Sequence, residues 1–271
     1  MAERSSHNLP MQPTPLIGRE REVQAVLDLI RRDEVRLVTL TGPGGTGKTR
    51  VGIRAAAALL TDYDDGAFFV DLAPLRDPAL VIPTVAQTLG VHDTGAGTVL
   101  DRLVGHLQDR RLLLLLDNFE HVLSAGPAFS SLLGACSRLK LLVTSRAALR
   151  LRGERELPVA PLALPGPGQS TRPDGLLNFA APALFMARAT DVRPDFTLGD
   201  RDGPLIAEIC RRLDGLPLAI ELAAARIKHL TPQSMLLRLD PRLPFLIGGA
   251  RDLPERQQTL RATITLSLIH I

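Results

Sequence analysis

The sequence predicts an α/β protein, a three-layer sandwich with a parallel sheet, followed by a small all-α helical domain. Short aliphatic runs alternate with stretches of helical periodicity through the first part of the chain. The runs are continuously apolar, which is typical of parallel strands covered on both faces. After a stretch rich in Pro and Gly at 163–175, only helical periodicity remains.

The first predicted elements surround the Gly-rich motif that is described below. Residues 1–15 are polar and Pro-rich, and we expect a flexible lead-in there. Apolar residues recur at helical spacing over Glu20–Arg32, which predicts an amphipathic helix. The β-branched and aliphatic run Val35–Thr41 predicts a buried strand, and the Ala-rich stretch Thr49–Leu60, with one apolar face, predicts a helix.

The alternation continues to Leu162. Aliphatic runs predict four more strands, at Ala67–Leu72, Arg111–Asn118, Leu139–Arg146 and Arg155–Leu162. Helical spacing predicts helices between them at 78–90, 98–108 and near 127–137. Pro83 is expected in the first turn of its helix or at a distortion.

The rest of the chain is expected to be helical. The predicted helices are 178–190, 203–214, 218–230 and 232–239. We therefore expect a flexible segment at 1–15, an α/β domain at 16–162, a linker at 163–175, a helical domain at 176–240, and a further C-terminal region at 241–271.

The composition disfavours several classes of function. The formal net charge is only +3, aromatic residues make up 3%, and no basic run carries interleaved aromatics, so this segment shows no nucleic-acid face. Cys136 and Cys210 lie in apolar stretches without a Cys/His cluster, and we expect two buried thiols rather than a disulfide or zinc site. The N-terminus lacks an apolar signal region, and Leu112–Leu116 is too short to cross a bilayer. We expect a soluble cytoplasmic protein with no membrane partner.

The segment Gly42–Thr49, GPGGTGKT, matches the P-loop pattern G-x-x-x-x-G-K-[ST]. It follows a predicted strand and opens a predicted helix, which is the context that distinguishes a P-loop from a Gly-rich turn. Backbone N–H groups of such a loop surround a phosphate chain, and the helix N-terminus faces the same charge. The residues expected to form this cradle are Gly42, Pro43, Gly44, Gly45, Thr46 and Gly47.

Three further residues of this segment are expected at the nucleotide. Lys48 can reach the β- and γ-phosphates, and the Thr49 hydroxyl can ligate Mg²⁺. Arg50 directly follows and is a further candidate for nucleotide contact. The sequence therefore predicts a site for ATP or ADP with Mg²⁺.

Asp117 ends a strand of five leucines. An apolar strand that delivers an acid at its carboxyl end is typical of Walker B, where the carboxylate organises Mg²⁺; the alternative is a solvated strand-end Asp. Asn118 follows where hydrolytic ATPases often have a second acid, so we expect slow hydrolysis. Glu120 lies nearby in the sequence without an assigned role.

Arg146 ends the next strand. Because parallel strands point their carboxyl ends at one crevice, we expect Arg146 to face the phosphates and to sense the γ-phosphate. We therefore count Arg146 with Lys48 and Asp117 as catalytic candidates. The alternative is one more surface arginine in an Arg-rich chain.

Two short motifs lie outside the predicted sandwich. Gly18–Glu20 starts the first helix, and Gly215–Ala219, GLPLA, separates two later helices. Alone, they are a Gly at a helix boundary and a Pro at a helix start.

Taken with the other motifs, they make the chain resemble the STAND class of signalling ATPases, in the branch related to NB-ARC and AP-ATPase modules. The resemblance is greatest to the ATPase modules of bacterial LuxR-type and SARP-type regulators. The segments that carry the resemblance are LIGRERE (16–22), LTGPGGTGKTR (40–50), FFVDLAPLRDP (69–78), LLLLLDNFEHVL (112–123), LLVTSRAALRLRGERELPV (141–159), ICRRLDGLPLAIELAAARI (209–227) and GGARDLPERQQTLRATI (248–264).

The resemblance implies roles that spacing alone does not give. It places Arg19 near the adenine or ribose and makes Arg146 the γ-phosphate sensor. It also implies that Pro217 packs against the adenine and so holds the helical domain on the nucleotide. It implies a switch, closed with ADP and open with ATP, with self-association in the ATP state. DNA contact is expected only through modules absent from this chain.

The resemblance also implies that 241–271 is the start of a truncated winged-helix region. The final residues Thr265–Ile271 depart from the family pattern. A DNA sequence that resembles a transposase-based sequencing adapter also encodes the string LSLIHI. We therefore expect an artificially ended reading frame.

Two other classes of NTPase share the P-loop pattern. A AAA-type remodelling or loading ATPase is the main alternative, and GLPLA together with the lack of a recognisable Arg-finger segment favours the switch over it. A small GTPase needs an NKxD-like base-reading motif, which the sequence lacks. Steady-state turnover separates the switch from the remodeller.

Overall fold

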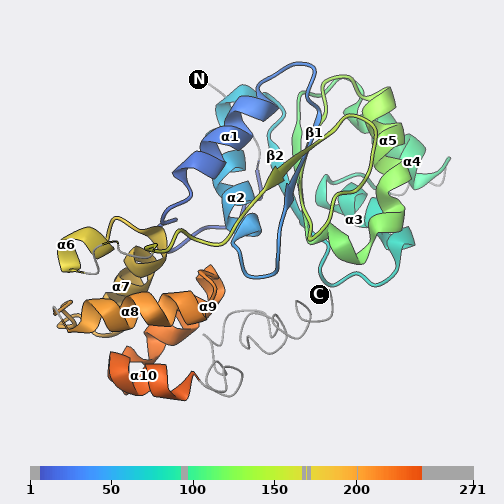
Figure 1. Ribbon diagram of the computed structural model, residues 1–271. Coiled ribbons are helices and arrows are strands. Elements are labelled where there is room, and N and C mark those ends of the chain that lie inside the picture. The colour runs from blue at the N-terminus through green and yellow to red at the C-terminus, as the bar shows by residue number, and fades with distance from the viewer. Residues whose placement is uncertain (1–6, 93–96, 167–168, 170–171, 200, 240–271) are drawn as a thin grey trace. The chain divides into compact units, whose positions relative to one another are not determined.

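The computed structural model describes residues 7–92, 97–166, 169, 172–199 and 201–239 (Figure 1). The described chain packs into two compact units. The first comprises the residues up to Gly42 and those from Lys48 to Val159. The second comprises Pro43–Gly47 and the residues from Ala160 onward, so the tip of the Gly-rich loop packs with the second unit.

The first unit contains a five-stranded sheet whose strands are all parallel. The strands are β1 (Leu37–Thr41), β2 (Ala67–Asp71), β3 (Leu113–Asp117), β4 (Lys140–Thr144) and β5 (Glu154–Pro158). Their order is β2-β3-β4-β1-β5, and the predicted parallel sheet is confirmed. Because β4 lies between β1 and β3, the carboxyl ends of these three strands are neighbours.

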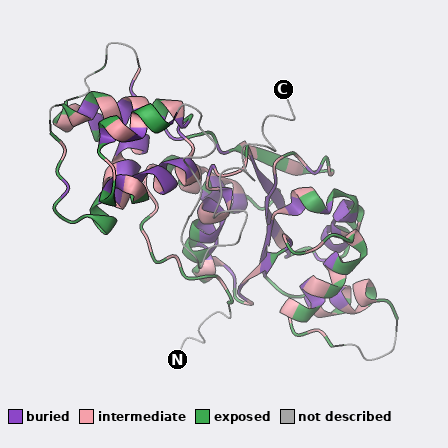
Figure 2. Ribbon diagram, turned by 90° about the horizontal axis from the view of Figure 1, so that it is seen from below, coloured by how far each residue is buried: buried purple, intermediate pink, exposed green. Residues whose placement is uncertain are grey.

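Helices cover both faces of the sheet, which confirms the three-layer sandwich (Figure 2). On one face the core includes side chains of α1 (Glu20–Ile30) and α2 (Lys48–Ala58). On the other face it includes side chains of α3 (Val81–Thr88), α4 (Val99–Leu107) and α5 (Gly126–Ala135). Pro83 falls in the first turn of α3, as expected, where its missing N–H costs no helical hydrogen bond.

The leucine run of β3 shows why a central strand is apolar throughout. Successive side chains of a strand point to opposite faces. Leu113 and Leu115 join the core beneath α1 and α2, whereas Leu114 and Leu116 join the core beneath α3, α4 and α5. All four are completely buried, so neither set of positions tolerates a polar residue.

The N-terminal segment differs from the flexible lead-in that we expected for 1–15. His7 forms a parallel bridge with Ala67, and the Asn8 amide donates to the carbonyl of Phe69 (2.9 Å) while its oxygen accepts from the Phe69 N–H (2.6 Å). These contacts satisfy backbone groups at the outer edge of β2, which ends the sheet on that side. Residues 7 and 8 therefore pair with the edge of the sheet, although their polar composition gave no sign of it.

The second unit is helical, as predicted. Its helices are α6 (Pro173–Leu176), α7 (Ala180–Val192), α8 (Asp202–Arg212), α9 (Pro217–Ala224) and α10 (Pro232–Arg238), with a 3-10 turn at Ala225–Lys228. An ion pair of 3.0 Å between Arg188 and Glu221 joins α7 to α9. Helix α6 begins inside the stretch that we expected to be linker.

The end of the predicted fifth strand is corrected by the structure. Strand β5 stops at Pro158, short of Leu162. The Leu162 N–H instead donates to the Gly215 carbonyl (2.8 Å), and the Ala181 N–H donates to the Ala163 carbonyl (3.1 Å). Apolar periodicity did not distinguish a strand from an extended segment that pairs with a turn between helices.

Two expectations concern the chain as a whole. The predicted winged-helix region at 241–271 lies outside the described residues. In the described part of the chain, none of the helices has the length and apolar character needed to cross a membrane.

Candidate functional site

The Gly-rich loop joins the end of β1 to the start of α2 at Lys48. Gly45 (φ 79°) and Gly47 (φ 91°) have backbone conformations that side chains disfavour. The Thr46 hydroxyl donates to the Pro43 carbonyl (3.0 Å) and closes the loop. Within the described part of the chain the amides of Gly44 and Gly47 donate no hydrogen bond. Such amides are donors available to a phosphate.

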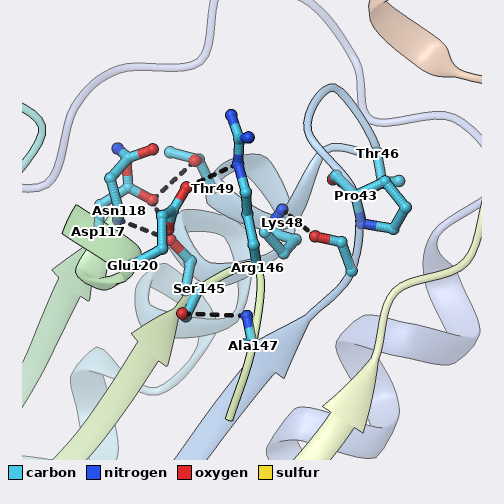
Figure 3. A network of polar contacts seen from close by, with 12 residues as sticks. Pro43, Thr46, Lys48, Thr49, Asp117, Asn118, Glu120, Ser145, Arg146 and Ala147 are labelled. Atoms are coloured by element: carbon cyan, nitrogen blue, oxygen red, sulfur yellow. Dashed lines mark hydrogen bonds and ion pairs between the residues drawn. The ribbon is translucent and has the colours of Figure 1, made fainter. Parts of the chain in front are cut away.

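Lys48 is buried at the first position of α2. Its Nζ donates to the carbonyl of Gly42 (2.8 Å), across the loop (Figure 3). Burial lowers the pKa of the Lys48 amine and the Arg146 guanidinium lowers it further, whereas Glu120 and Asp117 oppose the shift. A bound phosphate would add negative charge next to this buried amine and favour its protonated form.

Asp117 lies at the carboxyl end of β3, and two hydroxyl groups hold it. Thr49 Oγ1 donates to Asp117 Oδ1 (2.7 Å), and Thr144 Oγ1 donates to the same oxygen (2.5 Å). Burial raises the pKa of the Asp117 carboxyl, and the hydrogen bonds from Thr144 and Thr49 oppose this shift. The structure therefore brings together the two residues predicted to organise Mg²⁺.

Asn118 follows in the left-handed region, with φ 62°. Its side-chain Nδ2 donates to Asp117 Oδ2 (2.5 Å) and lies 3.4 Å from Asp71 Oδ1. Its backbone N–H donates to Thr144 Oγ1 (3.0 Å). An acid in place of Asn118 would add a third carboxylate beside Asp117 and Asp71 and would remove the donor to Asp117 Oδ2.

Glu120 is the residue whose position the sequence did not predict. It lies in a 3-10 turn (Phe119–His121), directly after β3, and the Phe119 ring anchors this turn in the core, 5.5 Å from the ring of Phe129. Glu120 Oε1 forms an ion pair of 3.2 Å with Nε of Arg146 (Figure 3). The signal that could have found it is an acid just past the end of a strand that already delivers Asp117.

The donor set fits a Mg²⁺ ion. Carboxylate and hydroxyl oxygens are the ligands that Mg²⁺ takes, usually one or two from the protein with phosphates and water completing the shell. Thr49 Oγ1 and Asp117 Oδ1 are such oxygens and are adjacent. No cluster of three or more His, Cys, Asp or Glu able to hold a metal occurs among the described residues, so the structure there offers no all-protein cage.

The remaining candidates occupy other positions. Arg19 is buried at the N-cap of α1 and pairs with Glu22. Arg50 donates to the carbonyl (2.7 Å) and the hydroxyl (3.0 Å) of Thr14, so it holds the N-terminal segment. Pro217 is the first residue of α9.

The loop tip makes one contact with the GLPLA motif inside the second unit. The N–H of Leu218, in the first turn of α9, donates to the carbonyl of Gly45 (3.3 Å). This is a long hydrogen bond, yet it links two motifs that lie more than 160 residues apart in the sequence.

The sequence comparisons identify a domain and a group of relatives. Residues 31–158 match the family described as AAA domain. A candidate HTH-type transcriptional regulator of Mycobacterium tuberculosis is 42% identical over 233 residues, which are 86% of this chain and 25% of the relative. An uncharacterised protein of the same species is 38% identical over 262 residues, which are 96% of this chain and 63% of the relative. The chain thus spans a quarter of the first relative and less than two thirds of the second.

Solved structures share the fold at low sequence identity. A Walker-type ATPase of Pyrococcus abyssi superposes with a TM-score of 0.58 at 12% identity, over 82% of this chain and 71% of that one. Cdc6p of Pyrobaculum aerophilum gives a TM-score of 0.56 at 18% identity, over 89% of this chain and 72% of that one. These similarities concern the fold alone, and they agree with the parallel sheet and the helical region that follows it.

Proposed function

Residues 31–158 form a P-loop ATPase domain of the AAA family, and from this premise we propose that the chain is an ATP- and ADP-binding regulatory switch with slow ATP hydrolysis. The observation that carries the proposal is the contact of 2.7 Å between Thr49 and Asp117. It joins the last residue of the P-loop motif to the acid at the end of β3. That pairing of motifs is the arrangement that holds a nucleotide with its metal ion.

In this proposal each part of the site has one task. The backbone N–H groups of the loop 42–47, which Pro43 lacks, bind the phosphate chain, and Lys48 gives up its bond to the Gly42 carbonyl to contact the β- and γ-phosphates. Thr49 and Asp117 hold Mg²⁺ through the oxygens that now share a hydrogen bond. The bound ion supplies charge neutralisation for the phosphates.

Arg146 is proposed to distinguish ATP from ADP. It follows β4, which lies between the strand that precedes the loop and the strand that delivers Asp117. Its Nε is 3.2 Å from Glu120 but makes no aligned hydrogen bond among the described residues. A γ-phosphate can therefore accept a hydrogen bond from this guanidinium while Glu120 stays paired with it, whereas ADP has no group at that position.

The second unit is proposed to close on the nucleotide. Support comes from the Leu218–Gly45 hydrogen bond, which associates GLPLA with the phosphate-binding loop. The proposed contacts of Pro217 with the adenine, and of Arg19 with the adenine or ribose, rest on the resemblance to STAND ATPases. Division of the chain into a P-loop domain at 16–162 and a helical domain at 176–240 is part of the same proposal.

The cellular role is proposed from the relatives. Two mycobacterial proteins align over most of this chain, and one is a candidate HTH-type transcriptional regulator. We place the chain as the ATPase module of such a cytoplasmic regulator, with self-association in the ATP state. DNA contact would belong to other modules of the full regulator.

Turnover separates this switch from a remodelling or loading ATPase. The purified chain should retain ADP, detectable by denaturing it and chromatographing the released nucleotide. Added Mg-ATP should be hydrolysed well below the rates of about 1–10³ s⁻¹ that are typical of enzymes. Rapid multiple turnover with no retained ADP would favour the remodelling ATPase.

A further inference from the structure

Only one of the two oxygens of the Glu120 carboxylate has a partner among the described residues. Its Oε1 pairs with Arg146, whereas Oε2 is buried and has no hydrogen-bond partner within the described structure. The Glu120 side chain is 14% exposed. A buried carboxylate oxygen without a donor is costly, and it indicates a partner that arrives with a ligand or as a bound water.

The other acid at the end of β3 has its oxygens occupied. Asp117 accepts from Thr49 and Thr144 on Oδ1 and from Asn118 on Oδ2. The Asn118 amide donates to a carboxylate and has no basic site for a proton. Among these groups, Glu120 is the one with an open acceptor.

Glu120 lies in the same network of polar side chains as Lys48, Thr49 and Arg146 (Figure 3). The Glu120 carboxylate contributes to the electrostatic environment of the Lys48 amine, and it raises the pKa of that amine. Its ion-pair partner Arg146 is the residue proposed to contact the γ-phosphate. Because the Glu120 carboxylate lies close to Lys48 and Arg146, it can accept a hydrogen bond from a water molecule beside the γ-phosphorus.

We propose that Glu120 is the catalytic base of ATP hydrolysis, a proposal that rests on the nucleotide site described above. A water that donates to Oε2 attacks the γ-phosphorus, and the bond from that phosphorus to the β–γ bridging oxygen breaks. The water proton passes to Oε2 and then to solvent, and the products are ADP and inorganic phosphate. The ion pair through Oε1 holds the carboxylate in the orientation that this transfer needs.

The test compares wild type with Glu120→Gln, which keeps the shape of the side chain and removes the base. Single-turnover hydrolysis of Mg-ATP should fall roughly 10²-fold or more, the effect expected for loss of a general base. The ATP and ADP dissociation constants should change by less than the rate, and the circular dichroism melt should show a folded chain. Glu156→Gln, an exposed glutamate on β5, is the matched control and should hydrolyse ATP at the wild-type rate.

A purely electrostatic role through Arg146 gives a different pattern. If Glu120 acts only as the counterion of Arg146, Glu120→Gln should have no effect on the rate in an Arg146→Gln background. A base still matters in that background, so the rate should fall again. An unchanged rate in Glu120→Gln, or a wild-type chain that binds ATP without hydrolysing it, overturns the assignment. Failure of the wild type to bind ATP instead removes the proposed function itself.

Discussion

Asn118 and Glu120 show how single residues set the chemistry of the site. The sequence predicted Lys48, Thr49 and Asp117 as neighbours because a P-loop and an acid at a strand end carry that geometry with them. It could not predict the pairing of Glu120 with Arg146 (3.2 Å), since that contact joins turns after two different strands. It also gave no reason for Asn118, whose amide donates to the Asp117 carboxylate.

Arg146→Ala should weaken ATP binding more than ADP binding. Loss of one charge-assisted contact to the γ-phosphate is worth roughly 1–3 kcal/mol, which corresponds to about 5- to 150-fold in affinity. Calorimetric titration with a non-hydrolysable ATP analogue and with ADP measures both losses. Arg155→Ala, at an exposed position of β5, should affect neither nucleotide. Equal losses for ATP and ADP in Arg146→Ala would indicate a structural arginine.

At the scale of elements, aliphatic runs predicted all five strands, and helical spacing predicted the main helices. The strand ends were less well predicted, because apolar residues continue beyond the paired part, as at Val35 before β1. The pairing of Asn8 with β2 and of Leu162 with Gly215 could not be predicted. Each is a backbone contact between distant segments, and local patterns do not encode such partners.

The turn between α8 and α9 makes a prediction at this scale. Gly215 has φ 66°, and a Cβ there would lie 2.5 Å from the Leu162 carbonyl oxygen. Gly215→Ala should therefore lower the free energy of unfolding by about 1–3 kcal/mol, through strain and loss of the close backbone approach. Urea unfolding followed by circular dichroism measures the change.

Gly105→Ala is the control for the same chemical change. Gly105 lies inside α4, and a Cβ there meets nothing within 4 Å. Alanine should raise helix stability at that position by up to ~1 kcal/mol. If both substitutions were neutral, the Leu162–Gly215 contact would not contribute to stability.

At the scale of the whole molecule, each unit has its own core and one buried cysteine. Cys136 ends α5 in the first unit, and Cys210 lies in α8 of the second. Burial raises the pKa of the Cys210 thiol to about 12 and also raises the pKa of the Cys136 thiol. Each thiol should therefore react with a disulfide reagent only when its unit opens.

This gives a test of whether both units hold the nucleotide. In Cys136→Ser and Cys210→Ser variants, the remaining thiol reports on one unit. Mg-ADP should slow modification of both thiols, because a ligand that binds only the closed, folded state reduces opening. Protection of Cys136 alone would show that the helical unit takes no part in binding. Lys48→Ala should remove the protection in either variant.

Calorimetric titration of Lys48→Ala with Mg-ADP and Mg-ATP tests whether Gly42–Thr49 binds a nucleotide. The wild-type chain, freed of retained nucleotide, should bind both, and Lys48→Ala should lose most of the affinity while its melt shows a folded protein. Lys140→Ala is the matched control, since its Nζ donates to the carbonyls of Ile30 (2.6 Å) and Arg32 (2.7 Å). It should lower stability and leave nucleotide affinity unchanged. Equal affinity of wild type and folded Lys48→Ala would contradict the account.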